Sequence, residues 1–325
     1  MGPKTVAETI CELSRRHLED NNGLLLGQCV SAVGWVNHTV PDCKGIVELP
    51  MTDVAGAGIA VGAAMVGRRP IFVIRFQDLL TLNGSPIINY AAKSQELHGR
   101  STPIFVRALA SEGLGPVHSG VLHGIFMHFP GLRVAAPMTP GEYRQAWQEF
   151  MENEDPMIVS EHRDSFQNAA EMADKLRPSA DITLYPISSP RFAVDQATRM
   201  LAREGIRCNV IHLCRLKPFH PTRRHLTPLE HTRLGLVIDA GFEICGASRS
   251  IAYELADASG CPVKALGLAD KTKCLHPPFQ NRAPDAAAIC NAVHQALGAK
   301  APQPWPAAAL HAGYSHTNGL IQRGA

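Results

Sequence analysis

Two side chains have types and settings suited to chemistry. Asp53 stands between the apolar segment "VELP" and the alanine- and glycine-rich run of residues 54–67, where the pattern changes from strand to helix. A carboxylate there can cap the helix or face a ligand. His118 lies in the glycine-rich stretch "GLGPVHSG", where an imidazole suits proton transfer or anion binding, or braces its own loop.

The glycines that follow Asp53 form a GxGxxxG pattern at Gly56, Gly58 and Gly62. In a dinucleotide-binding turn the first glycine follows the strand almost at once. Here "PMTDVA" separates Leu49 from Gly56. We therefore interpret the three glycines as small residues that let a helix pack closely on its neighbour.

Other candidate groups give weaker signals. Ser119 beside His118 is adjacent only in sequence, and the chain has no GxSxG motif, so a hydrolase is not indicated. His123 and His128 fall on one expected helix, and we interpret them as packing or capping groups. No carboxylate or cysteine completes a ligand set with these histidines, so we predict no metal site in this chain.

Composition limits the class of protein and its partners. Lys and Arg number 31 against 29 Asp and Glu, a net charge of +2 without basic stripes, so nucleic acid and anionic membrane are not expected as partners. The nine cysteines include no CxxC pair and fit reduced thiols in a cytoplasmic protein. The N-terminal segment carries charges throughout and lacks the apolar core of a signal peptide.

The positions of apolar segments predict an α/β fold with a parallel sheet. Residues 6–19 have helical spacing, and short apolar strands follow at 24–30, 45–49, 69–76, 102–108, 132–137 and 156–161. A second series has strands at 181–187, 208–213, 234–241 and 262–268, with a helix at 191–205. We expect domains at 1–175 and 185–300, and an irregular Pro- and Ala-rich tail at 301–325.

The sequence resembles a known family along most of its length. The segment "LPMTDVAGAGIAVGAAMVGRRPI" is similar to the beta subunit of thiamine-diphosphate-dependent 2-oxoacid dehydrogenases of the pyruvate, branched-chain and acetoin types. The segments "RFQDLLTLNGSPIINYAAK", "GPVHSGVLHGIFMHFPGLRVAAP", "DPMIVSEHR", "LKPF" and "VIDAG" resemble later parts of the same subunit. The resemblance implies a transketolase-like pyrimidine-binding domain followed by a smaller α/β domain of the transketolase C-terminal type.

The resemblance also implies roles for particular residues. Asp53 takes the place of the carboxylate that binds the aminopyrimidine of thiamine diphosphate, usually a glutamate, and is shorter by about 1.3 Å. His118 matches the family's active-site histidine, implicated in proton transfer and in acylation of the lipoyl group. Near the coenzyme, Leu79 replaces an aromatic ring, Gln28 replaces a glutamate, and Arg75 stands where several relatives carry a neutral residue.

The implied activity requires a second subunit. The chain contains no Gly-Asp dipeptide, so a separate alpha subunit is expected to hold Mg²⁺ and the diphosphate, in an α2β2 assembly. The enzyme, an oxidoreductase, would decarboxylate a 2-oxoacid and pass the acyl group to a lipoylated dihydrolipoyl acyltransferase. A lyase, carboligase or transketolase-like activity on the same scaffold is the alternative, and a catalytically altered assembly subunit is the third hypothesis.

Overall fold

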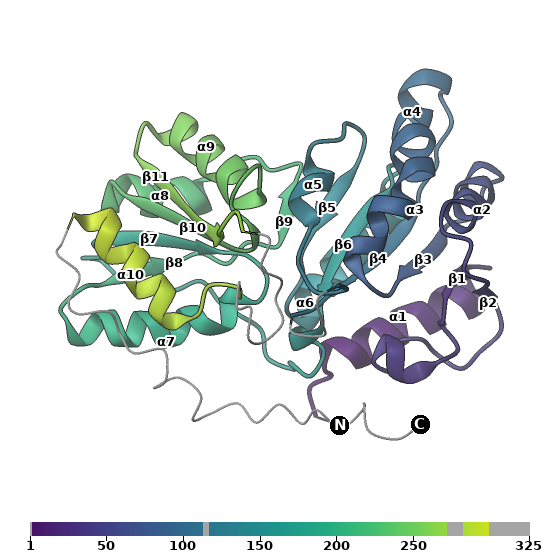
Figure 1. Ribbon diagram of the computed structural model, residues 1–325, viewed down its shortest axis with the longest axis horizontal. Helices are drawn as coiled ribbons and strands as arrows, with labels where there is room; N and C mark the ends of the chain where they lie inside the picture. Colours follow the sequence, from purple (N-terminus) through teal and green to yellow (C-terminus); the bar gives the residue numbers. More distant parts are fainter. Residues whose placement is uncertain (1, 113–116, 272–281, 299–325) are drawn as a thin grey trace.

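Two β-sheets with helices on both faces organise the chain (Figure 1). The structure, a computed structural model, describes residues 2–112, 117–271 and 282–298. The predicted tail at 301–325 therefore lies outside the described residues. Within them the α/β class predicted from the spacing of apolar segments is confirmed.

The first sheet contains seven strands in the order β2-β1-β3-β4-β6-β5-β9. All neighbouring pairs are parallel except β5 with β9. The strand bounds are β1 (Leu24–Gln28), β2 (Ile46–Leu49), β3 (Pro70–Ile74), β4 (Phe105–Ala110), β5 (Arg133–Ala135), β6 (Met157–His162) and β9 (Arg215–Lys217).

Helices cover both faces of the first sheet, and alternation along β3 shows why. Ile71 and Val73 face the cluster that includes α1 and α6, whereas Phe72 and Ile74 face the cluster of α2 to α4, because successive strand side chains point to opposite faces. The helices are α1 (Val6–Asp20), α2 (Val54–Met65), α3 (Leu80–Pro86), α4 (Ala92–His98), α5 (His123–Met127) and α6 (Pro140–Glu152).

Short irregular turns complete this part of the chain. They are the 3₁₀ turns η1 (Val33–Val36), η2 (Gln77–Leu79) and η4 (Arg163–Ser165), and the π-helical turn η3 (Ile87–Ala91), which joins α3 to α4. Each of the six strands expected before residue 165 is present, although β9 was not expected as a strand of this sheet.

The second sheet has four parallel strands in the order β11-β10-β7-β8. α7 and α10 pack on one face, and α8 and α9 on the other. The bounds are β7 (Ile182–Pro186), α7 (Pro190–Arg203), β8 (Cys208–Val210), α8 (Arg223–Thr232), β10 (Gly235–Phe242), α9 (Ala247–Ser259), β11 (Val263–Leu268) and α10 (Ala286–Leu297).

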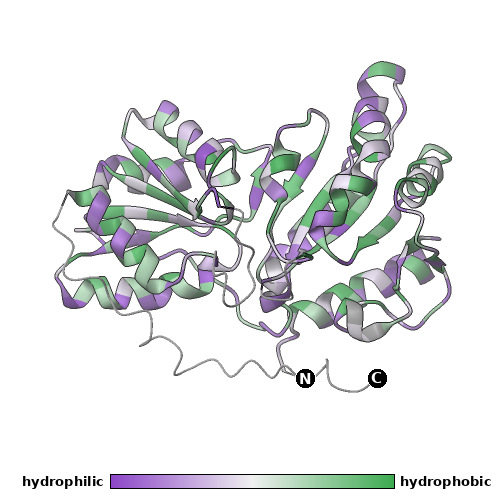
Figure 2. Cartoon of the chain, in the orientation of Figure 1, coloured by the Kyte–Doolittle hydropathy of each residue, from purple (hydrophilic) through white to green (hydrophobic). Residues whose placement is uncertain are grey.

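The two sheets share a core. One hydrophobic cluster runs from Leu26 and Phe72 of the first sheet to Val237 of the second and Ile251 of α9, and Figure 2 shows the strands of both sheets mainly in the colour of hydrophobic residues. An ion pair adds to this contact, because the buried Arg191 of α7 donates to both oxygens of Glu142 in α6, at 2.6 and 2.8 Å. The two sheets are therefore joined by a shared core, to which α5 contributes by contacting β10 and α9.

Two charged residues inside the first sheet are paired with each other and with neighbouring hydroxyl groups. Arg107 of β4 and Glu161 of β6 are fully buried and form two hydrogen bonds, at 2.8 and 2.9 Å. Tyr143 donates to the same carboxylate at 2.6 Å, and Arg107 donates to the Thr39 hydroxyl at 2.6 Å. Because each charge has its partner, these strands remain compatible with a dry core.

Candidate active site

The candidate residues gather at one edge of the first sheet. Parallel strands have their carboxyl ends at the same edge, and there β1 ends at Gln28 and β3 ends just before Arg75. Asp53 follows β2, and His118 lies on the connection that leaves β4. The sequence order of the strands thus brings residues from four connections to a common edge.

Asp53 occupies the N-cap position of α2 without acting as a side-chain cap. Its backbone has φ +37° and ψ −98°, and its side chain makes no capping hydrogen bond. Among the described residues the carboxylate has neither a hydrogen bond nor an ion pair, although the residue is half-buried. The capping interpretation is therefore wrong for this side chain, and an acceptor remains available beside a strained backbone.

Three of the other predicted residues line one small cavity. Gln28, Arg75 and Leu79 border it together with Asn83 and the end of β3, and its volume is about 10 Å³. With its amide oriented to suit its neighbours, Gln28 accepts hydrogen bonds through Oε1 from the backbone N–H groups of Thr52 and Asp53, both at 3.2 Å. Gln28 therefore fixes the backbone from which the Asp53 carboxylate projects.

His118 is held by a carboxylate and an aromatic ring. Its Nδ1 lies 3.1 and 3.3 Å from the two oxygens of Asp78, and its backbone N–H donates to Asp78 at 3.3 Å. The imidazole stacks on Phe76 with 4.3 Å between ring centroids and an interplanar angle of 12°. Like Asp53 it has a positive φ, +62°.

This arrangement selects a tautomer for His118. An ionised carboxylate only accepts hydrogen bonds, so the contact with Asp78 places a proton on Nδ1. In the neutral ring Nε2 is then the basic nitrogen, and no hydrogen bond of Nε2 is found within the described residues. The side chain is 41% exposed, which leaves this nitrogen open to a substrate.

Two guanidinium groups lie over the ring that supports His118. Arg75 and Arg163 lie 5.4 and 5.6 Å from the centre of Phe76, within the range of cation–π attraction. Arg163 also donates to the backbone carbonyl of Arg75 at 2.9 Å. Burial lowers the pKa of Arg163 to about 10, opposed by the charge of Glu161 and reinforced by that of Arg75.

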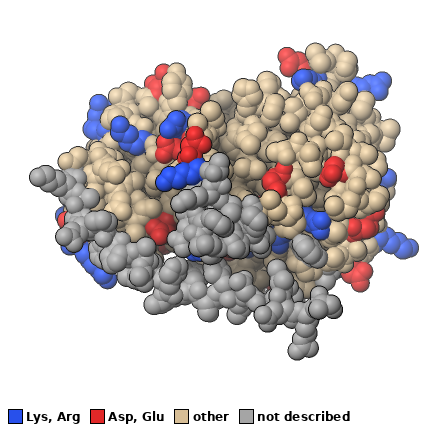
Figure 3. Space-filling model, viewed as in Figure 1, with Lys and Arg blue, Asp and Glu red and all other residues tan. Residues whose placement is uncertain are grey.

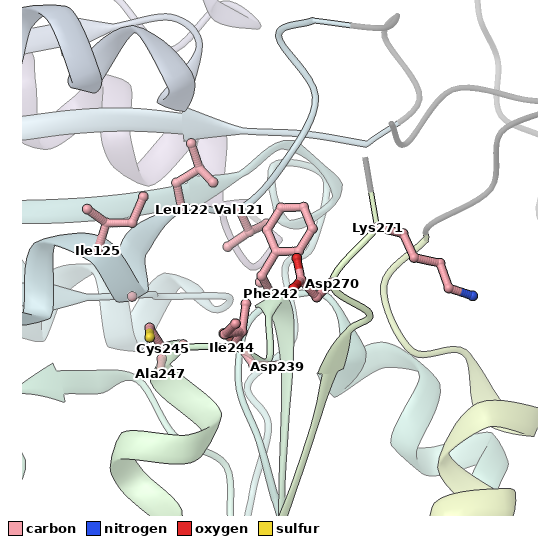
Figure 4. Close-up of a pocket in the computed structure, with 13 residues that line it drawn as sticks. Val121, Leu122, Ile125, Asp239, Phe242, Ile244, Cys245, Ala247, Asp270 and Lys271 are labelled. Carbon is pink, nitrogen blue, oxygen red and sulfur yellow. The ribbon is translucent and has the colours of Figure 1, made fainter. Parts of the chain in front are cut away.

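A larger cavity lies where α5 meets the second sheet (Figure 4). Its volume is about 390 Å³. Val121, Leu122 and Ile125 line one side, and residues after β10 and at the start of α9 line the other. Asp239 borders this cavity and also contacts His123, at 3.0 Å. His123, which we interpreted as a packing or capping group, is thus buried and hydrogen-bonded to Asp239.

The structure groups the five predicted residues into two sets. Gln28, Arg75 and Leu79 share a cavity and Gln28 contacts the Asp53 backbone, whereas His118 is attached to the next turn, η2. Sequence analysis missed Asp78, Phe76 and Gln77. The available signal was the position of Asp78 just after β3, equivalent to that of Asp53 after β2, since neighbouring parallel strands end at one edge.

The glycines after Asp53 have different surroundings. A Cβ atom on Gly56 would lie 3.1 Å from Leu49, but one on Gly58 or Gly62 would meet nothing within 4 Å. Close packing inside this chain is therefore confirmed for Gly56 alone. Within the described part of the chain no helix is long and apolar enough to cross a membrane, and no group of three or more His, Cys, Asp or Glu residues could hold a metal ion.

Comparison with known proteins identifies the family. Residues 31–168 match the family described as transketolase, pyrimidine binding domain. The chain is 30% identical over 221 residues to the 2-oxoisovalerate dehydrogenase subunit beta of Bacillus subtilis, covering 61% of this chain and 68% of that protein. The chain belongs to the family of 2-oxoacid dehydrogenase beta subunits. This family is thiamine-diphosphate-dependent.

Other relatives of this chain are named for different substrates. The acetoin:2,6-dichlorophenolindophenol oxidoreductase subunit beta of Cupriavidus necator is 27% identical over 235 residues, 68% of this chain and 69% of that one. A solved structure described as a split gene transketolase, inactive beta4 tetramer, has a TM-score of 0.73 at 17% identity, and covers 92% of this chain and 100% of its own. This last likeness shows the transketolase-like fold.

The residues present can receive one side of the coenzyme. The small cavity is about the size of one water molecule, so the described residues that line it do not enclose a pyrimidine ring. The Asp53 carboxylate is nevertheless a hydrogen-bond acceptor without a described partner, and Leu79 is a partly buried apolar side chain. An acceptor and an apolar side chain in this arrangement fit the pyrimidine end of thiamine diphosphate if the opposite wall comes from another chain.

Proposed function

We propose that this chain is the beta subunit of an enzyme that decarboxylates a 2-oxoacid and transfers the acyl group to a lipoyl group. The observation that carries the proposal is the Asp53 carboxylate, which has a strained backbone and no described hydrogen bond and lies within the segment that matches the pyrimidine-binding domain. A helix cap or a buried structural acid would instead have its acceptor oxygens occupied.

Thiamine diphosphate supplies, when bound, a carbon nucleophile that allows the bond between the 2-oxo carbon and the carboxylate to break. Asp53 would accept a hydrogen bond from the pyrimidine ring, and Leu79 would pack on that ring. His118 would hold or release a proton at Nε2 while Asp78 keeps the proton on Nδ1. The shorter reach of Asp53 requires the ring or the backbone to lie closer than a glutamate would need.

The surface of α2 supports a protein partner for this chain. Val54, Ile59, Met65 and Val66 are 51%, 52%, 45% and 81% exposed, and Gly58 and Gly62 leave open space beside the helix. Large parts of the face around the first sheet carry neither acidic nor basic side chains (Figure 3). We infer that an alpha subunit covers helix α2 and holds the diphosphate and Mg²⁺. Two alpha and two beta subunits would then form the α2β2 heterotetramer.

Two further assignments belong to the proposal. We divide the chain into a pyrimidine-binding domain at 1–175 and a C-terminal-type domain at 185–300, in agreement with the two sheets although β9 joins the first. The eight described cysteines are all free, which supports a reducing compartment such as the cytoplasm. A lipoylated dihydrolipoyl acyltransferase would accept the product.

The experiment is a titration followed by an assay of the complex formed with the alpha subunit. Calorimetry should detect binding of thiamine diphosphate with Mg²⁺ to the wild-type complex and weaker binding to Asp53→Asn. Absence of binding to the wild-type complex would favour the assembly-subunit hypothesis. Release of CO₂ from a 2-oxoacid that depends on a lipoyl domain supports the dehydrogenase, whereas coupling to an aldehyde without that domain would identify a carboligase.

A further inference from the structure

A buried chain of polar side chains connects the second sheet with the loop that carries His118. Asp239 in β10 and His123 at the start of α5 are 1% and 0% exposed, and Nε2 of His123 lies 3.0 Å from both carboxylate oxygens. Nδ1 of His123 lies 3.1 Å from the Ser160 hydroxyl in β6. Gln77 in η2 donates through Nε2 to the same hydroxyl at 2.9 Å.

The donor and acceptor roles along this chain are mutually consistent. The Asp239 carboxylate accepts, so Nε2 of His123 carries a proton. In the neutral ring Nδ1 accepts from the Ser160 hydroxyl, whose oxygen in turn accepts from the Gln77 amide N–H. The remaining amide oxygen of Gln77 accepts from the backbone N–H of Leu122. Each link therefore orients the next.

The last two links hold both ends of a short segment. Gln77 binds the backbone of Leu122, and the adjacent residue Asp78 binds His118 through its backbone N–H and Nδ1. Residues 118–122 are thus attached to one 3₁₀ turn at two points. Because Gln77 and Asp78 are adjacent in η2, a shift of this turn would change both attachments and with them the direction in which the His118 imidazole points.

We propose that Asp239 is a positioning residue for His118, acting through His123, Ser160 and Gln77 across the contact between the two sheets. Stability alone does not explain this chain, because buried polar partners can often be replaced together by apolar residues without loss. A connected series of an acid, an imidazole, a hydroxyl and an amide instead fixes a geometry. The importance of His118 rests on the proposed function, but its position can be measured without coenzyme or substrate.

The first experiment truncates the middle of the chain in the full-length protein. Ser160→Ala should raise hydrogen–deuterium exchange at the Leu122 amide about fivefold, the effect of one lost hydrogen bond on a local opening. Carbethoxylation of His118 by diethyl pyrocarbonate, followed in its peptide by mass spectrometry, should accelerate as well. Ser248→Ala is the matched control, since Ser248 is a fully buried serine with no hydrogen-bond partner for its hydroxyl in the described structure.

The second experiment tests whether the second sheet takes part. Asp239→Leu should reproduce the faster exchange and carbethoxylation, whereas Asp239→Asn, which keeps an oxygen acceptor for His123, should stay within about twofold of wild type. The double variant Ser160→Ala with Asp239→Leu should exceed the stronger single variant by less than twofold, because both changes break one network.

Several outcomes would overturn the proposal. They are equal effects of Ser160→Ala and Ser248→Ala, equal effects of Asp239→Asn and Asp239→Leu, or multiplied effects in the double variant. Melting temperatures measured on the same samples separate local loosening from a general loss of stability. If these loop measurements behave as expected while the assembled enzyme binds no coenzyme, the proposed function fails and the positioning role of Asp239 stands.

Discussion

The two proposed catalytic residues lie at the same edge of one sheet but in opposite kinds of surroundings. His118 has a carboxylate on Nδ1 and on its backbone N–H, and an aromatic ring on one face. Behind this carboxylate the buried side chains of Gln77, Ser160 and His123 are linked by hydrogen bonds. The Asp53 carboxylate has no described hydrogen bond, and α2 beside it exposes apolar side chains.

This difference concerns which residues hold each half of the site in place. The histidine half is organised by the chain itself, across its two sheets. On the carboxylate half, the described residues leave the side chain of Asp53 without a hydrogen bond. A residue in a strained conformation persists only where its surroundings hold it. For Asp53 these surroundings include the hydrogen bonds of Gln28 to the Thr52 and Asp53 backbone and the bond from Ala57 N–H to the Asp53 carbonyl.

The largest expected effect is on activity at Asp53. Asp53→Asn should lower kcat/KM of the assembled enzyme by about 100-fold or more, because the amide loses the charge that favours the proton shift of the coenzyme. The melting temperature of this chain alone should be unchanged, since the carboxylate makes no described hydrogen bond. Full activity of Asp53→Asn would refute the role of this carboxylate. Asp53→Glu is the matched control, because it retains the charge.

The next effect concerns the open face of α2. Ile59→Glu should weaken binding of the alpha subunit by about 30-fold, a change typical of a charge placed in the centre of an interface, while the isolated chain keeps its stability. Leu176→Glu, at a residue 63% exposed and distant in sequence from α2, should leave binding unchanged. Equal binding by both variants, measured by surface plasmon resonance, would place the partner elsewhere.

On the histidine half, Asp78→Asn should lower kcat about 10-fold with little change in KM, in line with the loss of a residue that orients a catalytic group. The amide can still accept a hydrogen bond, but its carbonyl does so without a charge, so the Nδ1 tautomer is held less firmly. Steady-state kinetics on the assembled enzyme measure both constants. A rise in KM with unchanged kcat would show that Asp78 contributes only to substrate binding.

The sequence predicts the elements well because apolar periodicity reports burial directly. The helix expected at 6–19 is α1, and the strands at 24–30 and 45–49 contain β1 and β2. The three residues of β9 lie in the polar segment "RLK", and their pairing with β5 depends on a contact between distant parts of the chain. Period and composition carry no signal for such an edge strand.

The sequence indicates a candidate site residue only where its type and its immediate neighbours single it out. Asp53 and His118 stand out as single ionisable groups in apolar or glycine-rich surroundings, and the family resemblance adds Gln28, Arg75 and Leu79. The pairing of His118 with Asp78 crosses 40 positions, and that of His123 with Asp239 crosses 116. Partners this far apart can be identified only once the order of the strands is known.

A smaller effect, of opposite sign in the two states of the protein, is expected at Gly62. Gly62→Ala should stabilise the isolated chain by about 0.5–1 kcal/mol, because alanine favours a helix and its Cβ would meet nothing within 4 Å. If a partner helix approaches α2 closely, the same methyl group should weaken the complex. Urea unfolding and a binding measurement on the same variant test both signs; unchanged binding would show that no close approach occurs there.

The smallest expected effect is on the pH dependence of stability where Glu112 and His162 meet, 3.6 Å apart. Burial alone would lower the pKa of His162, but Glu112 and Asp164 outweigh it and raise this pKa above 6.5. Burial alone would likewise raise the pKa of Glu112, but His162 and the hydroxyl of Ser189 hold it below 4.5. Both groups are therefore charged in mildly acidic solution.

A histidine whose pKa is raised by folding contributes stability below its unfolded pKa, and this contribution is lost as pH rises through the folded pKa. The wild type should therefore exceed His162→Asn in free energy of unfolding by more at about pH 5.5 than at about pH 8.5. Urea unfolding of both proteins at each pH measures the difference. A constant difference would mean that His162 stays neutral, and that the contact of Glu112 with Ser189 of the second domain, at 3.0 Å, holds without a charged partner.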